Sequence, residues 1–258
     1  MKVVILAGGK GTRIQEESLI KPKPLIEIGS KPLIWHIMKT YSHYGYKEFI
    51  ICCGHKGYMI KEYFNNFSLH NSDVTIDVLK NKIKVHKNNN EDWKITLVDT
   101  GEKTFTGGRI LRIKNFVGET FLLTYGDGLS DINIKKLVEH HKSKKKLATI
   151  SIVQPAGRFG AVRFNSKNNL VESFSEKLKG DGGWINGGFF VLNNGIFKYL
   201  KDDQTMWEKE PLENISRKKE LTGYKHEGFW RPCDTIRDKI ILENLWNANE
   251  APWKVWEK

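Results

Sequence analysis

Cysteine is scarce in this chain, which holds three among 258 residues: Cys52, Cys53 and Cys233. Three cysteines at this spacing provide neither a disulfide framework nor a zinc site. Long apolar runs are also missing, since none approaches the roughly 20 residues of a membrane-spanning helix, and the N-terminus has no signal-peptide pattern. These absences exclude a disulfide-stapled secreted scaffold and a membrane protein, and they predict a soluble protein of the reducing cytoplasm.

Acidic residues are too few to balance the basic ones, and the formal net charge is +12. A basic surface can bind a polyanion without sequence preference, so a polyanion-binding protein is the alternative from a different functional class. The dense basic run, residues 142–146, follows an amphipathic helical pattern, and cations are favoured at the C-terminal end of a helix. Because no RNA- or DNA-binding motif is present, we expect no nucleic-acid partner.

The apolar segment 3–6 predicts a strand that enters a glycine-rich, basic loop at residues 7–13. Glycine has no Cβ, so such a backbone can approach a ligand closely, and its successive N–H groups can form a nest for an anion. Arg13, Lys21 and Lys23 add mobile positive charge. The loop is neither a P-loop nor a dinucleotide fingerprint, because it lacks Gly-Lys-Ser/Thr and the third glycine. A phosphate-binding loop and a tight turn with solvated cations remain as interpretations.

The connection after this loop is unusually long. A helix is predicted over 31–44, with Pro32 in its first turn, where the missing N–H of proline costs nothing, and Gly45 as its stop. About two dozen residues therefore separate strand from helix, against roughly 2–6 in most such connections. A connection of that length is more often functional than structural, which favours phosphate binding.

Apolar runs alternate with helical stripes along the chain. The predicted strands are 2–6, 48–53, 95–99, 120–124 and 147–153, and the predicted helices are 31–44, 56–65, 106–117 and 132–142. This alternation predicts an α/β fold, a Rossmann-like, mostly parallel mixed sheet with helices on both faces. An inserted β-hairpin is expected where residues 74–99 interrupt the pattern. Further alternating segments are 161–164, 170–174 and 187–192, and a last helix is expected at 235–246; we expect a single domain over 1–258.

Two aspartates are candidates for binding Mg²⁺. Asp127 follows the apolar run 121–125 and stands between two glycines, and ligands of open α/β sheets bind beyond the carboxyl ends of the strands. Mg²⁺ is usually held by one or two carboxylates together with substrate phosphates. Asp234, just before the last helix, is the second candidate, although by itself it is most simply the N-cap of that helix. A turn-capping role is the alternative for Asp127.

Taken together, these motifs resemble the sugar-1-phosphate nucleotidylyltransferases over essentially the whole chain. The matching stretches are Leu6–Arg13, Lys21–Pro24, Gly126–Gly128, Glu176–Lys177 and Asn186–Gly188, in family order. Later stretches, among them Gly157–Gly160 and Ala251–Lys254, are similar to the branch that uses CTP. The resemblance implies the nucleotide-diphospho-sugar transferase type of fold, with a nucleotide-binding part at 1–130 and a fused sugar-binding and C-terminal part at 131–258.

The resemblance also implies a role for each matched residue. The implied catalytic residues are Arg13, Lys23, Asp127 and Lys177. The nucleotide would be held by Leu6, Ala7, Gly8, Gly9, Gly11, Thr12, Arg13, Lys23, Thr104, Arg109 and Asp127. The sugar phosphate would be held by Gly160, Glu176, Lys177 and Asn186. Mg²⁺, the implied cofactor, would be held by Asp127 and Asp234.

The implied reaction joins CTP and α-D-glucose 1-phosphate to give CDP-glucose and pyrophosphate, for CDP-linked deoxysugar, O-antigen or capsule biosynthesis. It requires positioning and charge neutralisation rather than a covalent nucleophile. The family also implies a homo-oligomer, plausibly a hexamer. Leu178 stands where the family usually has proline, and Trp184 is larger than expected before Asn186. Both departures concern the sugar, so a uridylyl- or thymidylyltransferase acting on another sugar 1-phosphate is the alternative within the enzyme class.

Overall fold

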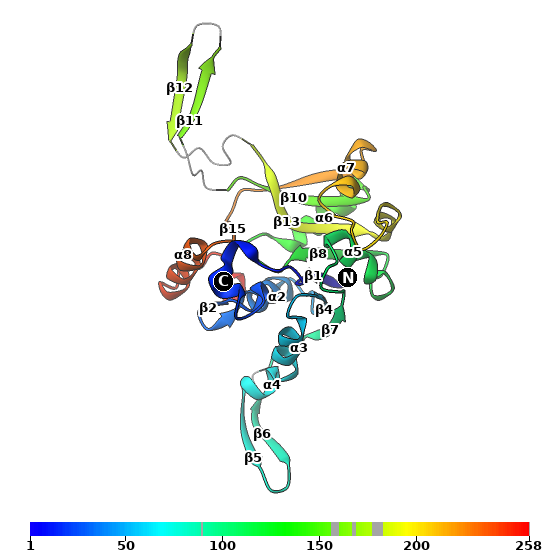
Figure 1. Ribbon diagram of the computed structural model, residues 1–258, viewed down its shortest axis with the longest axis vertical. Helices are drawn as coiled ribbons and strands as arrows, with labels where there is room; N and C mark the ends of the chain where they lie inside the picture. Colours follow the sequence, from blue (N-terminus) through cyan, green and yellow to red (C-terminus); the bar gives the residue numbers. More distant parts are fainter. Residues whose placement is uncertain (89, 156–159, 167–168, 177–182, 258) are drawn as a thin grey trace.

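A seven-stranded mixed sheet forms the centre of the molecule, with strand order β14-β10-β13-β8-β1-β4-β7 (Figure 1). The computed structural model describes residues 1–88, 90–155, 160–166, 169–176 and 183–257. Strand β13 is antiparallel to both of its neighbours, and the other pairs in this sheet are parallel. The predicted mixed, mostly parallel sheet is confirmed. The strands are β1 (Val3–Leu6), β4 (Glu48–Cys53), β7 (Lys94–Asp99), β8 (Thr120–Tyr125), β10 (Ala148–Val153), β13 (Ile185–Asn193) and β14 (Leu221–His226).

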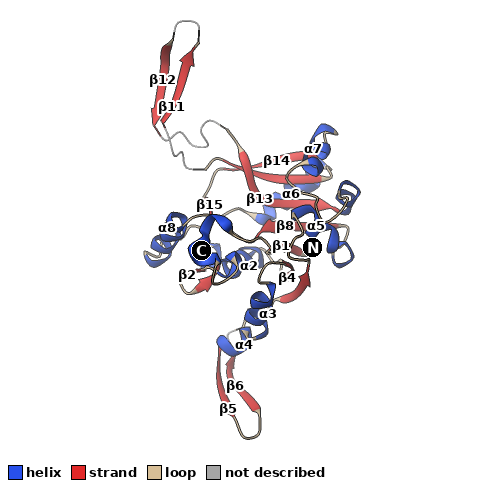
Figure 2. Ribbon diagram, viewed as in Figure 1, coloured by secondary structure: helices blue, strands red, loops and turns tan. Residues whose placement is uncertain are grey.

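Helices cover both faces of this sheet, as Figure 2 shows. Successive residues of β1 point to opposite faces, so Val3 and Ile5 belong to one buried cluster and Val4 and Leu6 to the other. The first cluster contains residues of α2 (Leu33–His43), α3 (Gly57–Asn65), α6 (Ile134–Lys144) and α8 (Ile236–Asn247). The second contains residues of α5 (Thr106–Arg112) and α7 (Glu210–Arg217). Burial on both sides explains why the strands read as continuous apolar runs.

The predicted boundaries hold closely except at the end of α5 and the start of α2. The helix predicted over 106–117 ends at Arg112, because the backbone of Ile113, with ψ 10°, leaves the α-helical conformation, and a separate 3-10 turn follows at Lys114–Phe116. We expected Pro32 in the first helical turn, but its backbone is extended, with ψ 153°, and the helix begins at Leu33. The reason is a small ladder in which β2 (Glu27–Ile28) pairs with β3 (Lys31–Pro32). Gly45 ends the helical segment with φ +85°, as predicted.

Two hairpins project from opposite ends of the body (Figure 1). One consists of β5 (Ser72–Asp77) and β6 (Lys82–Asn88), which confirms the predicted insertion. The other consists of β11 (Gly160–Asn165) and β12 (Leu170–Glu176). Short elements complete the fold: α1 (Gln15–Ser18), α4 (Phe67–His70), β9 (Gly128–Ser130) and β15 (Trp230–Pro232). No helix in the described part of the chain has both the length and the apolar character needed to cross a bilayer.

Candidate active site

A pocket of about 680 Å³ lies at the carboxyl ends of β1 and β8, where Leu6 pairs with Tyr125. This is the edge at which open α/β sheets bind ligands. The pocket lining includes every residue that we expect to hold the nucleotide: Leu6, Ala7, Gly8, Gly9, Gly11, Thr12, Arg13, Lys23, Thr104, Arg109 and Asp127. Asp234 and Asn186 line it as well. Residues from distant parts of the sequence therefore face one another here.

The glycine-rich loop takes its shape from close backbone packing. A Cβ on Gly8 would lie 2.3 Å from Cζ of Arg109, which leaves room for glycine alone in this arrangement. Gly11 has φ +66°, a left-handed conformation that turns the chain into the short helix beginning at Thr12. Ser18 donates a hydrogen bond of 3.0 Å to the carbonyl of Gly11, which holds that turn. The loop is thus fixed at both ends, with the segment between them open to the pocket.

Arg109 stabilises this loop through hydrogen bonds from its buried side chain. Only 4% of the residue is exposed, and its guanidinium donates to the carbonyl of Gly8 at 2.9 Å. It also donates to the hydroxyl of Thr100 and the carbonyl of Gly101, each at 2.7 Å. Burial lowers the pKa of Arg109 from its ordinary value. These contacts tie α5 to the carboxyl ends of β1 and β7, so Arg109 orders the glycine-rich loop in addition to lining the pocket.

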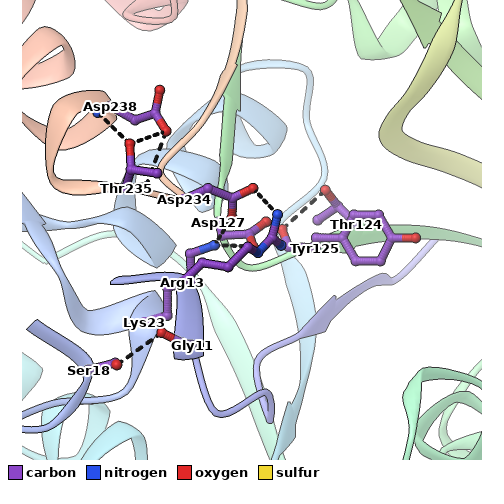
Figure 3. A network of polar contacts seen from close by, with 10 residues as sticks. All are labelled: Gly11, Arg13, Ser18, Lys23, Thr124, Tyr125, Asp127, Asp234, Thr235 and Asp238. Atoms are coloured by element: carbon purple, nitrogen blue, oxygen red, sulfur yellow. Dashed lines mark hydrogen bonds and ion pairs between the residues drawn. The ribbon is translucent and has the colours of Figure 1, made fainter. Parts of the chain in front are cut away.

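Two cations and two carboxylates that line the pocket form an ionic cluster (Figure 3). The ammonium of Lys23 lies 2.7 Å from Asp127 and also bonds to Asp234, whose other oxygen pairs with Arg13. The Lys23 side chain is 9% exposed, whereas that of Arg13 is 71% exposed. Burial alone would lower the pKa of Lys23, but attraction to Asp127 and hydrogen bonds to both carboxylates raise it above its ordinary value. Lys23 is therefore held charged in a buried position, whereas Arg13 pairs with Asp234 from a position exposed to solvent.

The two aspartates meet because of a short antiparallel ribbon. Strand β9 pairs with β15, and the N–H of Cys233 donates to the carbonyl of Asp127 at 2.8 Å. Our simplest reading of Asp234, the N-cap of the last helix, is wrong. Thr235 caps α8, in a capping box with Asp238. The Asp234 side chain is instead drawn to Lys23 and Arg13 (Figure 3).

The donor chemistry of Asp127 and Asp234 suits Mg²⁺. Groups of three or more His, Cys, Asp or Glu in metal-binding arrangement are absent from the described residues. Two carboxylates are nevertheless enough for Mg²⁺ when substrate phosphates and waters complete its six oxygen ligands. The cation now between the two carboxylates is the Lys23 ammonium, which shows that this position stabilises positive charge.

Comparison with known proteins identifies the family. The family model described as nucleotidyl transferase matches residues 2–231. The chain belongs to the nucleotidyl transferase family. This nucleotidyl transferase is 53% identical to glucose-1-phosphate cytidylyltransferase from Salmonella typhimurium, over 100% of both chains. It is 45% identical to a probable glucose-1-phosphate cytidylyltransferase from Bacillus subtilis, over 99% of this chain and 100% of the relative.

Solved structures share the fold of this nucleotidyl transferase. HddC from Yersinia pseudotuberculosis has a TM-score of 0.68 and 23% sequence identity, with 95% of this chain and 99% of that chain covered. The expected fold type is thereby confirmed.

Of the residues expected to hold the sugar phosphate, Asn186 on β13 lines the pocket of this nucleotidyl transferase. Gly160 and Glu176 pair with each other at the base of the β11–β12 hairpin. Lys177 and Leu178 lie outside the described residues. Trp184 is half-buried, with the ammonium of Lys225 5.3 Å from its ring centroid. The sugar-side assignments remain predictions.

Several pocket residues were not anticipated. Tyr125, Thr106, Glu208 and Trp230 all line it. Tyr125 directly precedes Gly126 and Asp127, so its position at a strand end was a usable signal. Glu208 stands in a charged stretch with no motif around it. Its hydrogen bonds to Thr106 at the start of α5 and to Tyr125 at the end of β8 place it at the pocket.

Proposed function

We propose that this nucleotidyl transferase joins CTP and α-D-glucose 1-phosphate to form CDP-glucose and pyrophosphate. The 53% identity to a glucose-1-phosphate cytidylyltransferase over the full length of both chains carries the proposal. The pocket supports it, because it combines an anion-binding glycine loop, two cations and two carboxylates at one strand edge. Such a set of groups suits the transfer of a nucleotidyl group between phosphates.

In the proposed reaction an oxygen of glucose 1-phosphate bonds to the α-phosphorus of CTP. The bond from that phosphorus to the bridging oxygen of the β-phosphate breaks, and pyrophosphate leaves. Both substrates are anions that repel each other, so the chain must hold them in line and neutralise their charge. Arg13 and Lys23 serve this purpose, and the planar fork of Arg13 suits the leaving pyrophosphate. Lys177 is proposed to hold the phosphate of the sugar.

Asp127 and Asp234 are proposed to hold Mg²⁺, which would neutralise charge on the transferred phosphate. For that purpose the ammonium of Lys23 leaves the carboxylates and binds a phosphate oxygen of the substrate. The three thiols of the chain take no part. All are buried and free, and burial raises the pKa of Cys53 to about 11 and of Cys233 to about 12.

Release of pyrophosphate from CTP, UTP, dTTP and GTP, each with a panel of sugar 1-phosphates, tests the proposal. We expect CTP with glucose 1-phosphate to be the fastest pair. Faster turnover with UTP or dTTP would establish the uridylyl- or thymidylyltransferase alternative. A salt-sensitive shift of random DNA that CTP does not compete away would support polyanion binding instead.

The proposal includes a cytoplasmic location and a homo-oligomer, with a hexamer as the expected assembly. Three free, buried thiols suit a reducing compartment. The tip of the β5–β6 hairpin supports association between copies, because Val78 is 86% exposed and Leu79 94% exposed. Large apolar side chains gathered on a projecting segment commonly mark an interaction surface.

A further inference from the structure

A chain of hydrogen bonds leads from Glu208 through Tyr125 to Asn186 along one wall of the pocket. We propose that Glu208 and Tyr125 are positioning residues that hold the Asn186 amide in one orientation, so that it offers an N–H to an acceptor oxygen of the sugar. This inference rests on the proposed function, since it takes Asn186 as a sugar contact. It explains how a side chain at a strand end can recognise one particular oxygen.

The orientation of the Asn186 amide follows from its own contacts. Its Oδ1 accepts the N–H of Gly188 at 2.8 Å, a contact that the NH₂ group could not make. Its Nδ2 donates to the hydroxyl of Tyr125 at 3.3 Å. One N–H of Nδ2 therefore remains for a ligand. A sugar hydroxyl that acts as acceptor satisfies it, whereas a deoxy position does not.

Tyr125 acts as acceptor toward Asn186 because its own proton is committed elsewhere. Its hydroxyl donates to Oε1 of Glu208 at 2.7 Å. The ring is also fixed sterically, since a Cβ on Gly188 would lie 2.7 Å from Cδ2 of Tyr125. The glycine at this position is needed for that close contact and for its φ of +81°.

Glu208 is held from its other side. The hydroxyl of Thr106 donates to Oε2 of Glu208 at 2.6 Å and accepts the backbone N–H of Trp207 at 3.0 Å. Trp207 is fully buried in the core cluster on that face of the sheet. Both carboxylate oxygens of Glu208 thus accept from hydroxyls on separate elements. We call this chain of hydrogen bonds, from Glu208 through Tyr125 to Asn186, the relay. Together with Thr106 it joins the start of α5, the end of β8 and the start of β13, which fixes its geometry before substrate binds.

Steady-state kinetics of Tyr125→Phe and Glu208→Ala test the relay. Each should raise the KM for glucose 1-phosphate about tenfold, the effect of losing one well-placed hydrogen bond, with kcat and the KM for CTP within about twofold of wild type. Glu208→Gln should restore the wild-type KM, because its amide oxygen accepts from Tyr125 and its NH₂ donates to Thr106. The matched controls are Tyr58→Phe and Glu213→Gln, which alter exposed residues outside the pocket.

A double-mutant cycle decides between a relay and independent contacts. If the relay acts through Asn186, Asn186→Ala combined with Tyr125→Phe is no worse than Asn186→Ala alone. The relay would be overturned if the two substitutions raised the KM for glucose 1-phosphate by factors that multiply in the double variant. It would also be overturned if the KM for CTP rose as much as the KM for glucose 1-phosphate. If Tyr125→Phe does not fold, Glu208→Ala replaces it in the cycle, since that change leaves the buried ring in place.

A readout independent of activity separates this inference from the proposed function. The NMR signals of the Asn186 side-chain NH₂, assigned with Asn186→Ala, should shift in Tyr125→Phe and in Glu208→Ala but not in Glu213→Gln. Unchanged signals would overturn the relay even in an active enzyme. Shifted signals in a chain that releases no pyrophosphate from CTP would support the relay and refute the proposed function.

Discussion

The ammonium of Lys23 lies 2.7 Å from the carboxylate of Asp127 and links the long connection after β1 to the end of β8. A buried ammonium without a carboxylate partner would cost several kcal/mol, so each residue of the pair stabilises the position of the other. Asp234 shares the same ammonium. The chain without substrate thus pairs the cations and carboxylates of the proposed site with one another, and we expect substrate phosphates to compete for the same cations.

Asp127→Asn should lower turnover by roughly 100-fold, because the variant keeps the shape of the side chain but loses the negative charge proposed to hold Mg²⁺, which would neutralise the charge on the transferred phosphate. Turnover at saturating CTP, glucose 1-phosphate and Mg²⁺ measures this. Asp77→Asn, in the projecting β5–β6 hairpin, is the matched control and should leave turnover unchanged. Near-normal turnover of Asp127→Asn at saturating Mg²⁺ would contradict the metal assignment.

Arg13→Ala should lower turnover far more than Lys144→Ala. Arg13 lines the pocket beside Asp234, whereas Lys144 is exposed at the end of α6. We expect a loss of about 100-fold for Arg13→Ala and no change for Lys144→Ala. Equal effects of the two variants on turnover would refute the phosphate-binding role of the loop.

Gly8→Ala should destabilise the fold, while Gly9→Ala should not. A Cβ on Gly8 would collide with the Arg109 guanidinium, whereas one on Gly9 meets nothing within 4 Å. We expect the free energy of unfolding in urea to fall by about 1–3 kcal/mol for Gly8→Ala. For Gly9→Ala it should stay within about 0.5 kcal/mol of wild type. Equal stabilities of the two variants would show that Arg109 does not fix the loop.

His36 should make the fold sensitive to mild acid. Burial lowers the pKa of His36 to about 4, and its ring contacts the carbonyl of Ile28 and the indole N–H of Trp253. Below the unfolded-state pKa of about 6.5 the unfolded chain binds the proton more readily, so stability is lost as the pH falls from there toward 4.

Urea unfolding at pH 7.5 and 5.5 measures this dependence. The free energy of unfolding should fall by about 1 kcal/mol more in wild type than in His36→Gln, which has no titrating ring. His43→Gln, at the C-terminal end of the same helix, is the control. Parallel pH curves for wild type and His36→Gln would exclude His36 as the source.

The tip of the β5–β6 hairpin should govern association between copies. Replacing both Val78 and Leu79 with serine removes the most exposed large apolar side chains at that tip, so light scattering should show a smaller particle than wild type. Lys80→Ser, in the same turn, should keep the wild-type mass. A monomeric wild type would refute the oligomer, and an unchanged mass of the double variant would exclude this hairpin as its contact.

The local pattern of apolar and polar residues was sufficient to predict most of the strands and helices. The strand predicted at 48–53 coincides with β4, because the apolar run from Phe49 to Cys53 suits a strand covered on both faces. The prediction for the start of α2 was wrong because proline suits both the first turn of a helix and the extended residue just before it. The pairing of Pro32 with Glu27 decided between the two.

The cap of α8 is a similar case. Aspartate and threonine are both good N-caps, so sequence could not choose between Asp234 and Thr235. Because the Asp234 carboxylate pairs with Lys23 and Arg13, Thr235 is the N-cap of α8. Glu208 could not be found at all, because a lone glutamate in a charged stretch carries no local signal.

Sequence alone determined the alternation of strands and helices, the glycine loop and the order of the family motifs, since each depends on residues close together in the chain. Tertiary structure decided which distant side chains meet. The direction of β13 and the β9–β15 ribbon bring Asp127, Asp234 and Asn186 to one strand edge, where Lys23 pairs with both aspartates. Contacts of this kind depend on strand order and packing, which no local pattern encodes.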